Sequence, residues 1–412
     1  MSLRTRSTLI TWMVLFLIPM AANLARAQDI GNLFRKAARD VVRRELSDES
    51  PPGQPSRATS QGEIFTVNTA DGWTLVAHRF RPKTAVPKPG AAPIILCHGL
   101  SYNALFWTLD ANCNFPDYLS KLGYDVWVVD LRGCGLSRKW VWKLDDAPNQ
   151  IIGDALRRMS KGKLGSGGYA TIDPKFADWS LDHHIFYDVP ALVTLVKHHT
   201  KADEVTWVGH SMGGIIALAH LSRFKNPGIG KLVTIGSQFT MPEGRLMIEF
   251  ASEMMAAREG QLTGKLVGRD VMNQGKTSVD NLFFNVKNTP PKVYEALSGW
   301  AKDIPAIALM RQYMTLSETG ILWDSRRKFD YSKAAANIKV PILVTCGASD
   351  QFAPPESQKY LFDHVGSTDK TLVIFGKAQG FAVDSGHDDT LVGNTSREQV
   401  YPLIERWISG SR

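Results

Sequence analysis

The stretch Val205-Thr206-Trp207-Val208-Gly209-His210-Ser211-Met212-Gly213-Gly214-Ile215-Ile216-Ala217-Leu218-Ala219 decides the fold. It opens with mostly β-branched and aromatic residues, which favour a strand, and ends in Ala, Leu and Ile, which favour a helix. Between the two stands G-x-S-x-G, a pattern in which a serine occupies a sharp turn from strand to helix. Gly209 and Gly213 are expected where the strand and the helix approach closely. The stretch therefore predicts Ser211 as an activated nucleophile.

The composition is that of a globular enzyme with a large core: 44% of the residues are hydrophobic and 21% are charged. The formal charge is +8, but the basic residues form no long run, so nucleic-acid binding is not indicated. The four cysteines show neither a C-x-x-C motif nor zinc-binding spacing. Cys113 and Cys134 are the pair for which a disulfide should be tested, whereas Cys97 and Cys346 are expected to be buried thiols.

Residues 1–27 are predicted to be a signal peptide. Arg4 and Arg6 precede an apolar run over residues 9–22, and Ala25 and Ala27 occupy the two positions that a signal peptidase reads. Cleavage near Ala27 would give an exported protein, either periplasmic or secreted. The alternative is that the apolar run stays in place as an N-terminal membrane anchor.

Residues 28–60 are expected to form a basic amphipathic helix followed by a linker. Apolar residues at helical spacing alternate with Lys and Arg in the first part, and Pro and Ser dominate residues 47–60. A basic amphipathic helix can lie on a membrane surface, so residues 30–46 are a candidate for membrane contact. A helix packed on its own domain and a partly disordered stalk are the alternatives.

Eight strand-like runs follow, at residues 63–67, 73–80, 93–97, 124–129, 205–210, 231–237, 341–347 and 371–375. The first two are joined through Asp71-Gly72, a dipeptide typical of a hairpin turn. Several of the others are continuously apolar, as expected of parallel strands that are covered on both faces. The sequence therefore predicts an α/β protein that opens with an antiparallel hairpin.

Three motifs occur in order along these runs: His98-Gly99, the D-x-R-G-x-G-x-S run of residues 130–137, and G-H-S-M-G. In this combination the chain resembles the α/β-hydrolase superfamily, and residues 123–127, 176–180 and 187–191 resemble its acid-lipase and esterase group. The resemblance implies a mostly parallel eight-stranded sheet with helices on both faces and an inserted helical cap. It places the core at residues 61–242 and 339–412 and the cap at 243–338. In such proteins Asp130 and Arg132 are structural.

The cap region carries Met and Leu at helical spacing, which would suit an acyl chain or would simply pack together. Residues 138–181 are more numerous than the superfamily usually places at this point. Trp140, Trp142, Trp179 and several glycines predict a flexible loop there, and this loop is a candidate wall of the substrate site.

Two further residues complete a predicted triad with Ser211. Asp350 comes directly after a predicted strand, and His387 lies on the loop after the last one. The chain order of serine, acid and histidine is the one that the superfamily uses. A carboxylate next to the histidine in sequence rarely reaches the far ring nitrogen, so Asp350 is preferred over three alternatives, Asp384, Asp388 and Asp389.

The N–H groups of Leu100 and Met212 are the predicted oxyanion donors. The Met212 N–H lies at the positive end of a helix, and Gly99 lets the backbone turn so that the Leu100 N–H faces the site. His98 is an alternative base but is expected to hold this loop. Two histidine pairs are interpreted as surface or capping residues rather than as a metal site: His183 with His184, and His198 with His199. His364 lies within a helical stretch and is not expected to be the base.

These features predict an exported serine hydrolase, a lipase or esterase, that cleaves a small-molecule or lipid ester through an acyl-enzyme. The expected chemistry needs neither a metal nor a cofactor. An acyltransferase or peptidase on the same fold is the alternative enzyme, because a triad does not choose its acyl acceptor. A catalytically silent ligand-binding module is the alternative outside enzymes. The oligomeric state is not addressed by the sequence.

Overall fold

The computed structural model describes residues 62–84, 86–137, 140–143, 169–172, 176–225, 227–240, 251, 254–255, 283–298 and 303–410. The predicted signal peptide, amphipathic helix and linker lie outside these residues. Of the helices within them, none combines the length and the apolar character needed to cross a bilayer.

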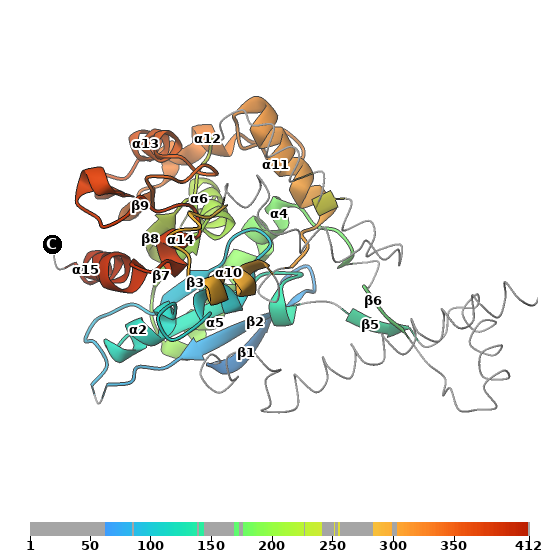
Figure 1. Cartoon of the computed structure of the whole chain (residues 1–412). Helices are drawn as coiled ribbons and strands as arrows, with labels where there is room; N and C mark the ends of the chain where they lie inside the picture. The colour runs from blue at the N-terminus through green and yellow to red at the C-terminus, as the bar shows by residue number, and fades with distance from the viewer. Residues whose placement is uncertain are drawn as a thin grey trace, which may run out of the picture. The chain divides into compact units, whose positions relative to one another are not determined.

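An eight-stranded sheet in the order β1-β2-β4-β3-β7-β8-β9-β10 runs through the described residues (Figure 1). β2 pairs antiparallel with β1 and with β4, and the other neighbours are parallel. The strands are β1 (Glu63–Asn68), β2 (Thr74–Phe80), β3 (Ile94–Cys97), β4 (Val126–Asp130), β7 (Val205–His210), β8 (Ile229–Ile235), β9 (Ile342–Gly347) and β10 (Lys370–Phe375). The predicted mostly parallel eight-stranded sheet is confirmed.

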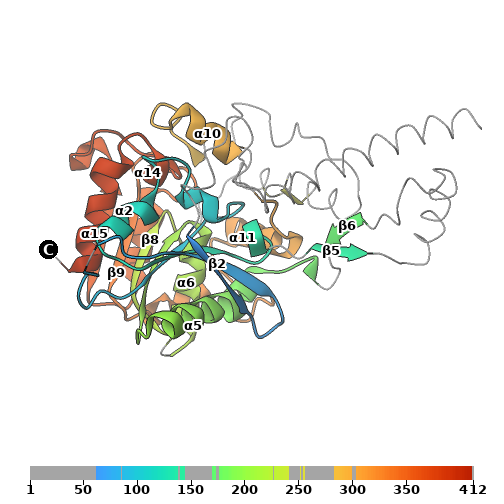
Figure 2. The ribbon, with the colours of Figure 1, turned by 90° about the horizontal axis from the view of Figure 1, so that it is seen from below.

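Helices cover both faces of this sheet, as the resemblance implied. Every residue of β3, β4, β7 and β9 is buried, because strands in the middle of a parallel sheet are covered on two sides. Figure 2 shows α2 and α15 on one face and α5 and α6 on the other. Their bounds are α2 (Phe115–Lys121), α5 (Val189–Thr200), α6 (Met212–Arg223) and α15 (Tyr401–Ser409).

The other helical elements range from short turns to a helix of 13 residues. The α-helices are α4 (Leu181–His183), α10 (Pro291–Ser298), α11 (Ile307–Thr319), α12 (Tyr331–Ala334), α13 (Pro355–His364) and α14 (Asp389–Val392). The 3-10 and π turns are η2 (Ala104–Trp107), η3 (Gly135–Ser137), η5 (His184–Asp188), η6 (Ala335–Asn337), η7 (Lys377–Gln379) and η8 (Ser396–Val400).

Two glycines with left-handed backbone set strand ends that matter for the site. Gly72 has φ of 88° in the turn between β1 and β2, so the predicted hairpin is confirmed. Gly236 has φ of 60° and ends β8, two residues earlier than the sequence predicted. Ser237, expected as strand, therefore lies in the loop above the sheet.

The predicted loop over residues 138–181 contains two short strands that the sequence did not indicate. β5 (Trp140–Lys143) pairs antiparallel with β6 (Tyr169–Ile172) in a separate two-stranded sheet. A four-residue strand is too short to give a periodicity that could be recognised in the sequence. Trp179 is only 3% exposed, and its ring packs edge-on against Trp73, so it belongs to the core.

The segment between β8 and β9 contains α10, α11 and α12 among its described residues, together with one isolated bridge between Trp323 and Asp330. These helices agree with the expected helical insertion. Its boundaries at residues 243 and 338 stay predictions, since residues 241–250 lie outside the description.

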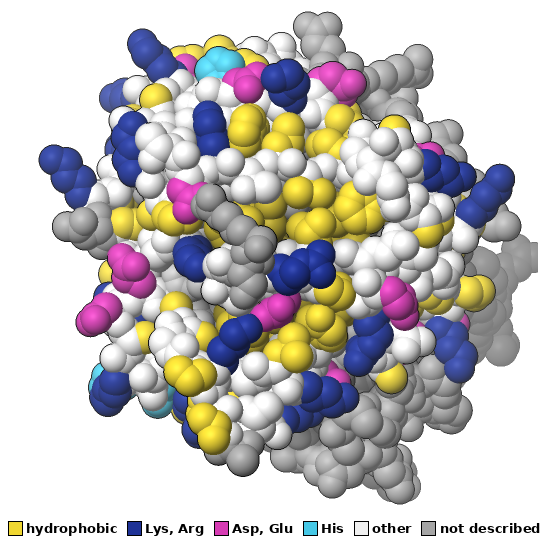
Figure 3. Space-filling view, turned by 90° about the vertical axis from the view of Figure 1, so that its left-hand side faces the viewer, with side chains coloured by type: hydrophobic (Ala, Val, Ile, Leu, Met, Phe, Trp, Pro, Cys, Tyr) yellow, Lys and Arg dark blue, Asp and Glu magenta, His cyan; other side chains and the backbone are white. Residues whose placement is uncertain are grey.

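The face formed around α13 and α15 carries hydrophobic side chains among scattered charges (Figure 3). Lys and Arg are interspersed with Asp and Glu on this face rather than gathered in one basic patch.

Candidate active site

Ser211 stands between the last residue of β7 and the first residue of α6. It is 3% exposed, and its backbone has φ of 51° and ψ of −120°, a strained conformation for a residue with a side chain. A Cβ on Gly209 would lie 2.3 Å from the Gly214 nitrogen, and one on Gly213 would lie 2.4 Å from the Cys97 oxygen. The predicted need for glycine at both positions is confirmed, and it follows from the closeness of the strand and the helix.

Hydrogen bonds to the neighbouring strand hold this strained turn in place. The Ser211 N–H donates to the Ile235 carbonyl at 2.8 Å, and the Ser237 hydroxyl donates to the Ser211 carbonyl at 2.8 Å. A Cβ on Gly214 would lie 2.1 Å from Ser237 Oγ, so the helix needs glycine there to admit this bond. Bonds of this kind offset the cost of a strained backbone.

His387 and Asp350 meet beside Gly236, although the chain separates them by 37 residues. His387 Nδ1 donates to Asp350 Oδ2 at 2.8 Å, and both side chains are buried. Asp350 Oδ1 accepts from the N–H groups of Phe352 at 2.9 Å and Ala353 at 2.7 Å. The carboxylate is thus oriented by the backbone of its own loop, and it orients the imidazole in turn.

The three alternative carboxylates are engaged elsewhere. Asp384 accepts from the Lys377 N–H at 2.8 Å, and Asp389 accepts from the Gly386 N–H at 3.0 Å. Asp388 accepts from the hydroxyl of Tyr102.

The charge environment of His387 favours its protonated form. Burial lowers the pKa of the imidazole, but the charge and hydrogen bond of Asp350, with the charges of Asp388 and Asp389, raise it, and the net pKa lies above the ordinary value. The other ring nitrogen, Nε2, is buried and makes no hydrogen bond to any described residue, Ser211 included. Bonds of this type are often long in ligand-free enzymes and tighten when substrate binds.

The loop after β3 lies directly against Ser211. A Cβ on Gly99 would lie 3.0 Å from Ser211 Cβ and 2.9 Å from His210 Nδ1. Leu100 follows in this loop, and Met212 begins α6, where the first N–H groups have no partner within the helix. Neither N–H is hydrogen-bonded to another described residue, so both are free to donate.

His98 and Arg132 have the structural roles that were expected for them. His98 Nδ1 donates to the Gly99 carbonyl at 2.9 Å, and His98 Nε2 accepts from the Leu131 N–H at 3.2 Å. Burial lowers the pKa of His98 to about 4, so the ring is neutral and holds the loop. Arg132 donates to Asp71 and Asp188, which makes it structural.

One prediction about the other histidines is wrong. His184 is not at the surface: it is 1% exposed, and its Nδ1 donates to Asp188 at 2.7 Å. His183 caps the start of α4 through Ser180, whereas His198 and His199 are exposed. The Asp188 contact comes from the next turn of the same helix, which sequence spacing alone does not distinguish from a solvent-facing pair.

All four cysteines are described and buried, and none of them forms a disulfide. The Cys113 thiol donates to the Val392 carbonyl at 3.2 Å instead of bonding to Cys134. The pair that the sequence singled out is therefore not joined, and Cys97 and Cys346 are buried thiols as predicted.

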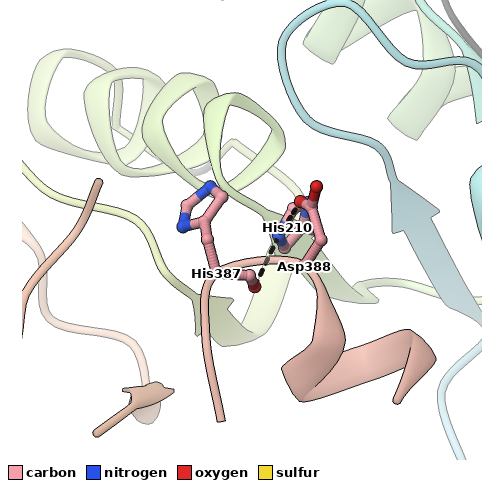
Figure 4. Close-up of side chains that lie close together, drawn as sticks. All are labelled: His210, His387 and Asp388. Carbon is pink, nitrogen blue, oxygen red and sulfur yellow. Dashed lines mark hydrogen bonds and ion pairs between the residues drawn. The ribbon is translucent and has the colours of Figure 1, made fainter. Parts of the chain in front are cut away.

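Among the described residues, one group has possible metal-ligand atoms close enough together to share an ion: His210, His387 and Asp388 (Figure 4). Their ligand atoms lie within 4.8 Å of one another. Asp350 holds Nδ1 of His387, and His210 Nε2 donates to the carbonyl of His387 at 3.3 Å. These contacts make the cluster a hydrogen-bonded assembly.

A family model described as the alpha/beta hydrolase fold matches residues 92–387, which cover β3 to His387. The chain belongs to this family. Lipase member K of Homo sapiens is 30% identical over 183 residues, 42% of this chain and 37% of that protein. Triacylglycerol lipase 2 of Arabidopsis thaliana is 25% identical over 405 residues, 85% of this chain and 89% of that one.

Matches to the first curated relatives span about a third of those proteins' length. Among solved structures, an esterase from Exiguobacterium antarcticum has a TM-score of 0.51 at 18% identity and covers 85% of this chain and 100% of that one. This likeness concerns the fold.

Three features of this hydrolase-fold site were missed in the sequence. Ser237 is the hydroxyl that supports the elbow, and Gly236 gives His387 its room. Asp303, from the insertion, accepts from the Asn103 side chain at 3.0 Å and the Gly135 N–H at 2.8 Å. In the sequence, the only signal for Ser237 and Gly236 is that a glycine and a serine follow a predicted strand, and this signal is weak. The third depends on a contact across 200 residues, for which the sequence carries no local signal.

Proposed function

We propose that this protein is a carboxylic ester hydrolase in which Ser211 is the nucleophile, His387 the general base and Asp350 the orienting acid. The observation that carries the proposal is the strained Ser211 at the start of α6, beside a buried His387–Asp350 pair with a hydrogen bond of 2.8 Å. Lipases among the relatives of this chain support the ester as substrate.

In the proposed reaction His387 Nε2 takes the proton of Ser211 as Oγ attacks the ester carbonyl carbon. The carbonyl oxygen becomes an oxyanion, which the N–H groups of Leu100 and Met212 stabilise; one such donor contributes about 3 kcal/mol. The imidazolium then gives its proton to the departing alcohol, and an acyl-serine remains. Water attacks the acyl-serine while His387 takes its proton, and the imidazolium then returns that proton to Ser211 Oγ as the acid is released.

Burial of the three side chains suits a reaction in which charge develops on them. Ser211, Asp350 and His387 are each no more than 3% exposed, so charge that develops there is poorly screened by water. The net effect of the surrounding carboxylates is to stabilise the imidazolium that forms during both steps. The proposed chemistry uses only these groups and water.

The test is burst kinetics on p-nitrophenyl esters of increasing acyl length, with Ser211→Ala as the comparison. A burst of nitrophenol equal to the enzyme concentration, followed by slower turnover and absent from Ser211→Ala, is the expected result. The preferred chain length then separates an esterase from a lipase. If neither protein turns over any ester, the proposal fails, and amide and acyl-transfer substrates become the next candidates.

We also propose that the protein is exported, on the strength of the basic and apolar pattern of residues 1–27. N-terminal sequencing of protein made in a bacterial host with an export pathway is expected to begin at Gln28. A chain that keeps residues 1–27 and sediments with membranes would support the anchored alternative instead.

A further inference from the structure

A second buried cluster packs against His387, with the ring centroids of His210 and His387 4.8 Å apart. It consists of Tyr102, Phe106, His210 and Asp388. Each of these side chains is no more than 3% exposed. Phe106 stacks on His210 with ring centroids 4.6 Å apart and on Tyr102 with centroids 5.0 Å apart. The proposed reaction uses none of these side chains.

Polar contacts join Tyr102, Asp388 and His210, and the stacking of Phe106 on Tyr102 and His210 completes a closed ring of contacts. The Tyr102 hydroxyl donates to Asp388 Oδ2, and Asp388 Oδ1 lies 3.4 Å from His210 Nε2. The same His210 nitrogen lies 3.3 Å from the carbonyl oxygen of His387. Figure 4 shows the His210 ring next to Asp388, while the ring of His387 points away from that carboxylate.

The protonation of His210 follows from its surroundings. Burial, and secondarily the charge of His387, lower its pKa well below the ordinary value, so the ring is neutral. Its Nδ1 lies against Gly99, where an added Cβ would come within 2.9 Å, and has no hydrogen-bond partner among the described residues. The single ring proton therefore belongs on Nε2, which donates it to the His387 carbonyl and lies 3.4 Å from Asp388 Oδ1.

The cluster thus contacts both the loop of Leu100 beside Ser211 and the loop that carries His387. His210 is the neighbour of Ser211 in the elbow, and it packs on Gly99, just before Leu100. Tyr102 lies on that same loop, with its N–H donating to the Gly99 carbonyl at 3.3 Å. Asp388 is the neighbour of His387, and its N–H donates to the Phe283 carbonyl at 2.8 Å.

We propose that Tyr102, His210 and Asp388 are positioning residues that align the loop of His387 with the loop of Leu100 around Ser211. The proposal rests on the proposed function, because it assigns these residues a task in the same reaction. Asp350 orients the imidazole through Nδ1, and the cluster places the backbone from which that imidazole extends. A donor or base displaced by about 1 Å can cost a hundredfold in rate, so alignment of two loops has a measurable effect.

The experiment compares Tyr102→Phe, Asp388→Asn and the double variant in ester hydrolysis. Each single variant removes one member of the ring while keeping its shape, and we expect kcat to fall at least tenfold with KM within about twofold. The double variant is expected to lose little more than the worse single variant, because both changes break the same ring. Tyr313→Phe is the matched control: Tyr313 is a buried tyrosine of α11 that lies outside the proposed machinery.

A pH profile separates alignment from a general loss of structure. Asp350, Asp388 and Asp389 are the charged groups that raise the pKa of His387, and the neutral His210 ring packs beside it. Asp388→Asn removes one of these charges, so the acid limb of kcat/KM is expected to move to lower pH. Tyr102→Phe keeps the charge and is expected to leave the limb in place.

Unchanged kcat in both single variants, or equal losses in Tyr313→Phe, would overturn the proposal. Losses that add fully in the double variant would overturn it as well. An NMR titration of the His387 ring, assigned with His387→Gln, needs no substrate. If the wild-type protein hydrolyses no ester but Tyr102→Phe, which keeps every charge, still shifts the His387 resonance, the ester-hydrolase proposal fails and the alignment stands.

Discussion

Gly236→Ala tests how much steric room the His387–Asp350 pair has. A Cβ at this position would lie 2.9 Å from both Cε1 and Nδ1 of His387 and 3.0 Å from Asp350 Oδ2. Ordinary contact begins at about 3.4–3.5 Å, so the ring would have to retreat by about 0.5 Å. Gly236 also has φ of 60°, where alanine costs about 1–2 kcal/mol of folding free energy.

The two effects can be separated with a second glycine. Gly320 ends α11 with φ of 67°, and nothing lies within 4 Å of the Cβ that alanine would add. Gly320→Ala should therefore lose about the same 1–2 kcal/mol in urea unfolding, with kcat/KM for a p-nitrophenyl ester unchanged. Gly236→Ala should lose that stability and also about 10- to 100-fold in kcat/KM, equal to about 1.4–2.7 kcal/mol of transition-state stabilisation.

The comparison has a clear contrary result. If Gly236→Ala keeps kcat/KM within twofold of Gly320→Ala while both fold, the imidazole tolerates the added methyl group. The placement of His387 would then not depend on Gly236, and the steric reasoning would be refuted.

Three further predictions concern charge. The acid limb of kcat/KM should have its midpoint above the ordinary histidine pKa, because the pKa of His387 is raised and only the neutral ring accepts a proton; a midpoint at pH 5 would contradict this. Asp350→Asn should move the midpoint to lower pH and reduce kcat by about 10⁴-fold, measured in the same assay. Burial lowers the pKa of His220 to about 4, so its protonation should remove about 3 kcal/mol of stability between pH 6.5 and 4, and urea unfolding of His220→Asn should show a loss smaller by that amount.

Most of the sheet could be predicted from the sequence because its strands are locally distinct. The strands β3, β4, β7 and β9 are short, mostly apolar runs, and burial on both faces requires such a composition. The strained elbow was equally local, since the two glycines and the serine lie within five residues. Elements whose character depends on distant partners were missed: the β5–β6 pair, and Trp179, which is buried because it packs on Trp73.

The polar side chains of the site show the same division. Chain order and strand ends placed Asp350 and His387, but three other carboxylates stand within three residues of His387. Only the fold shows that the Asp388 carboxylate turns toward Tyr102, a partner 286 residues away. Sequence spacing cannot predict such a direction, because it depends on how two loops meet above the sheet.

Asp303 extends this reasoning to the insertion. Its N–H donates to the Ser101 carbonyl at 2.7 Å, and its carboxylate accepts from Asn103 and from the Gly135 N–H. Ser101 and Asn103 directly follow Leu100, and Ser101 has φ of 64°, so this contact fixes a strained part of the loop that carries a proposed oxyanion donor. Asp303→Ala should therefore lower kcat several-fold with little change in KM, because it loosens the donor without touching the substrate. A change confined to KM would instead place Asp303 in substrate binding, and the insertion would then act as a wall rather than as a support for the oxyanion loop.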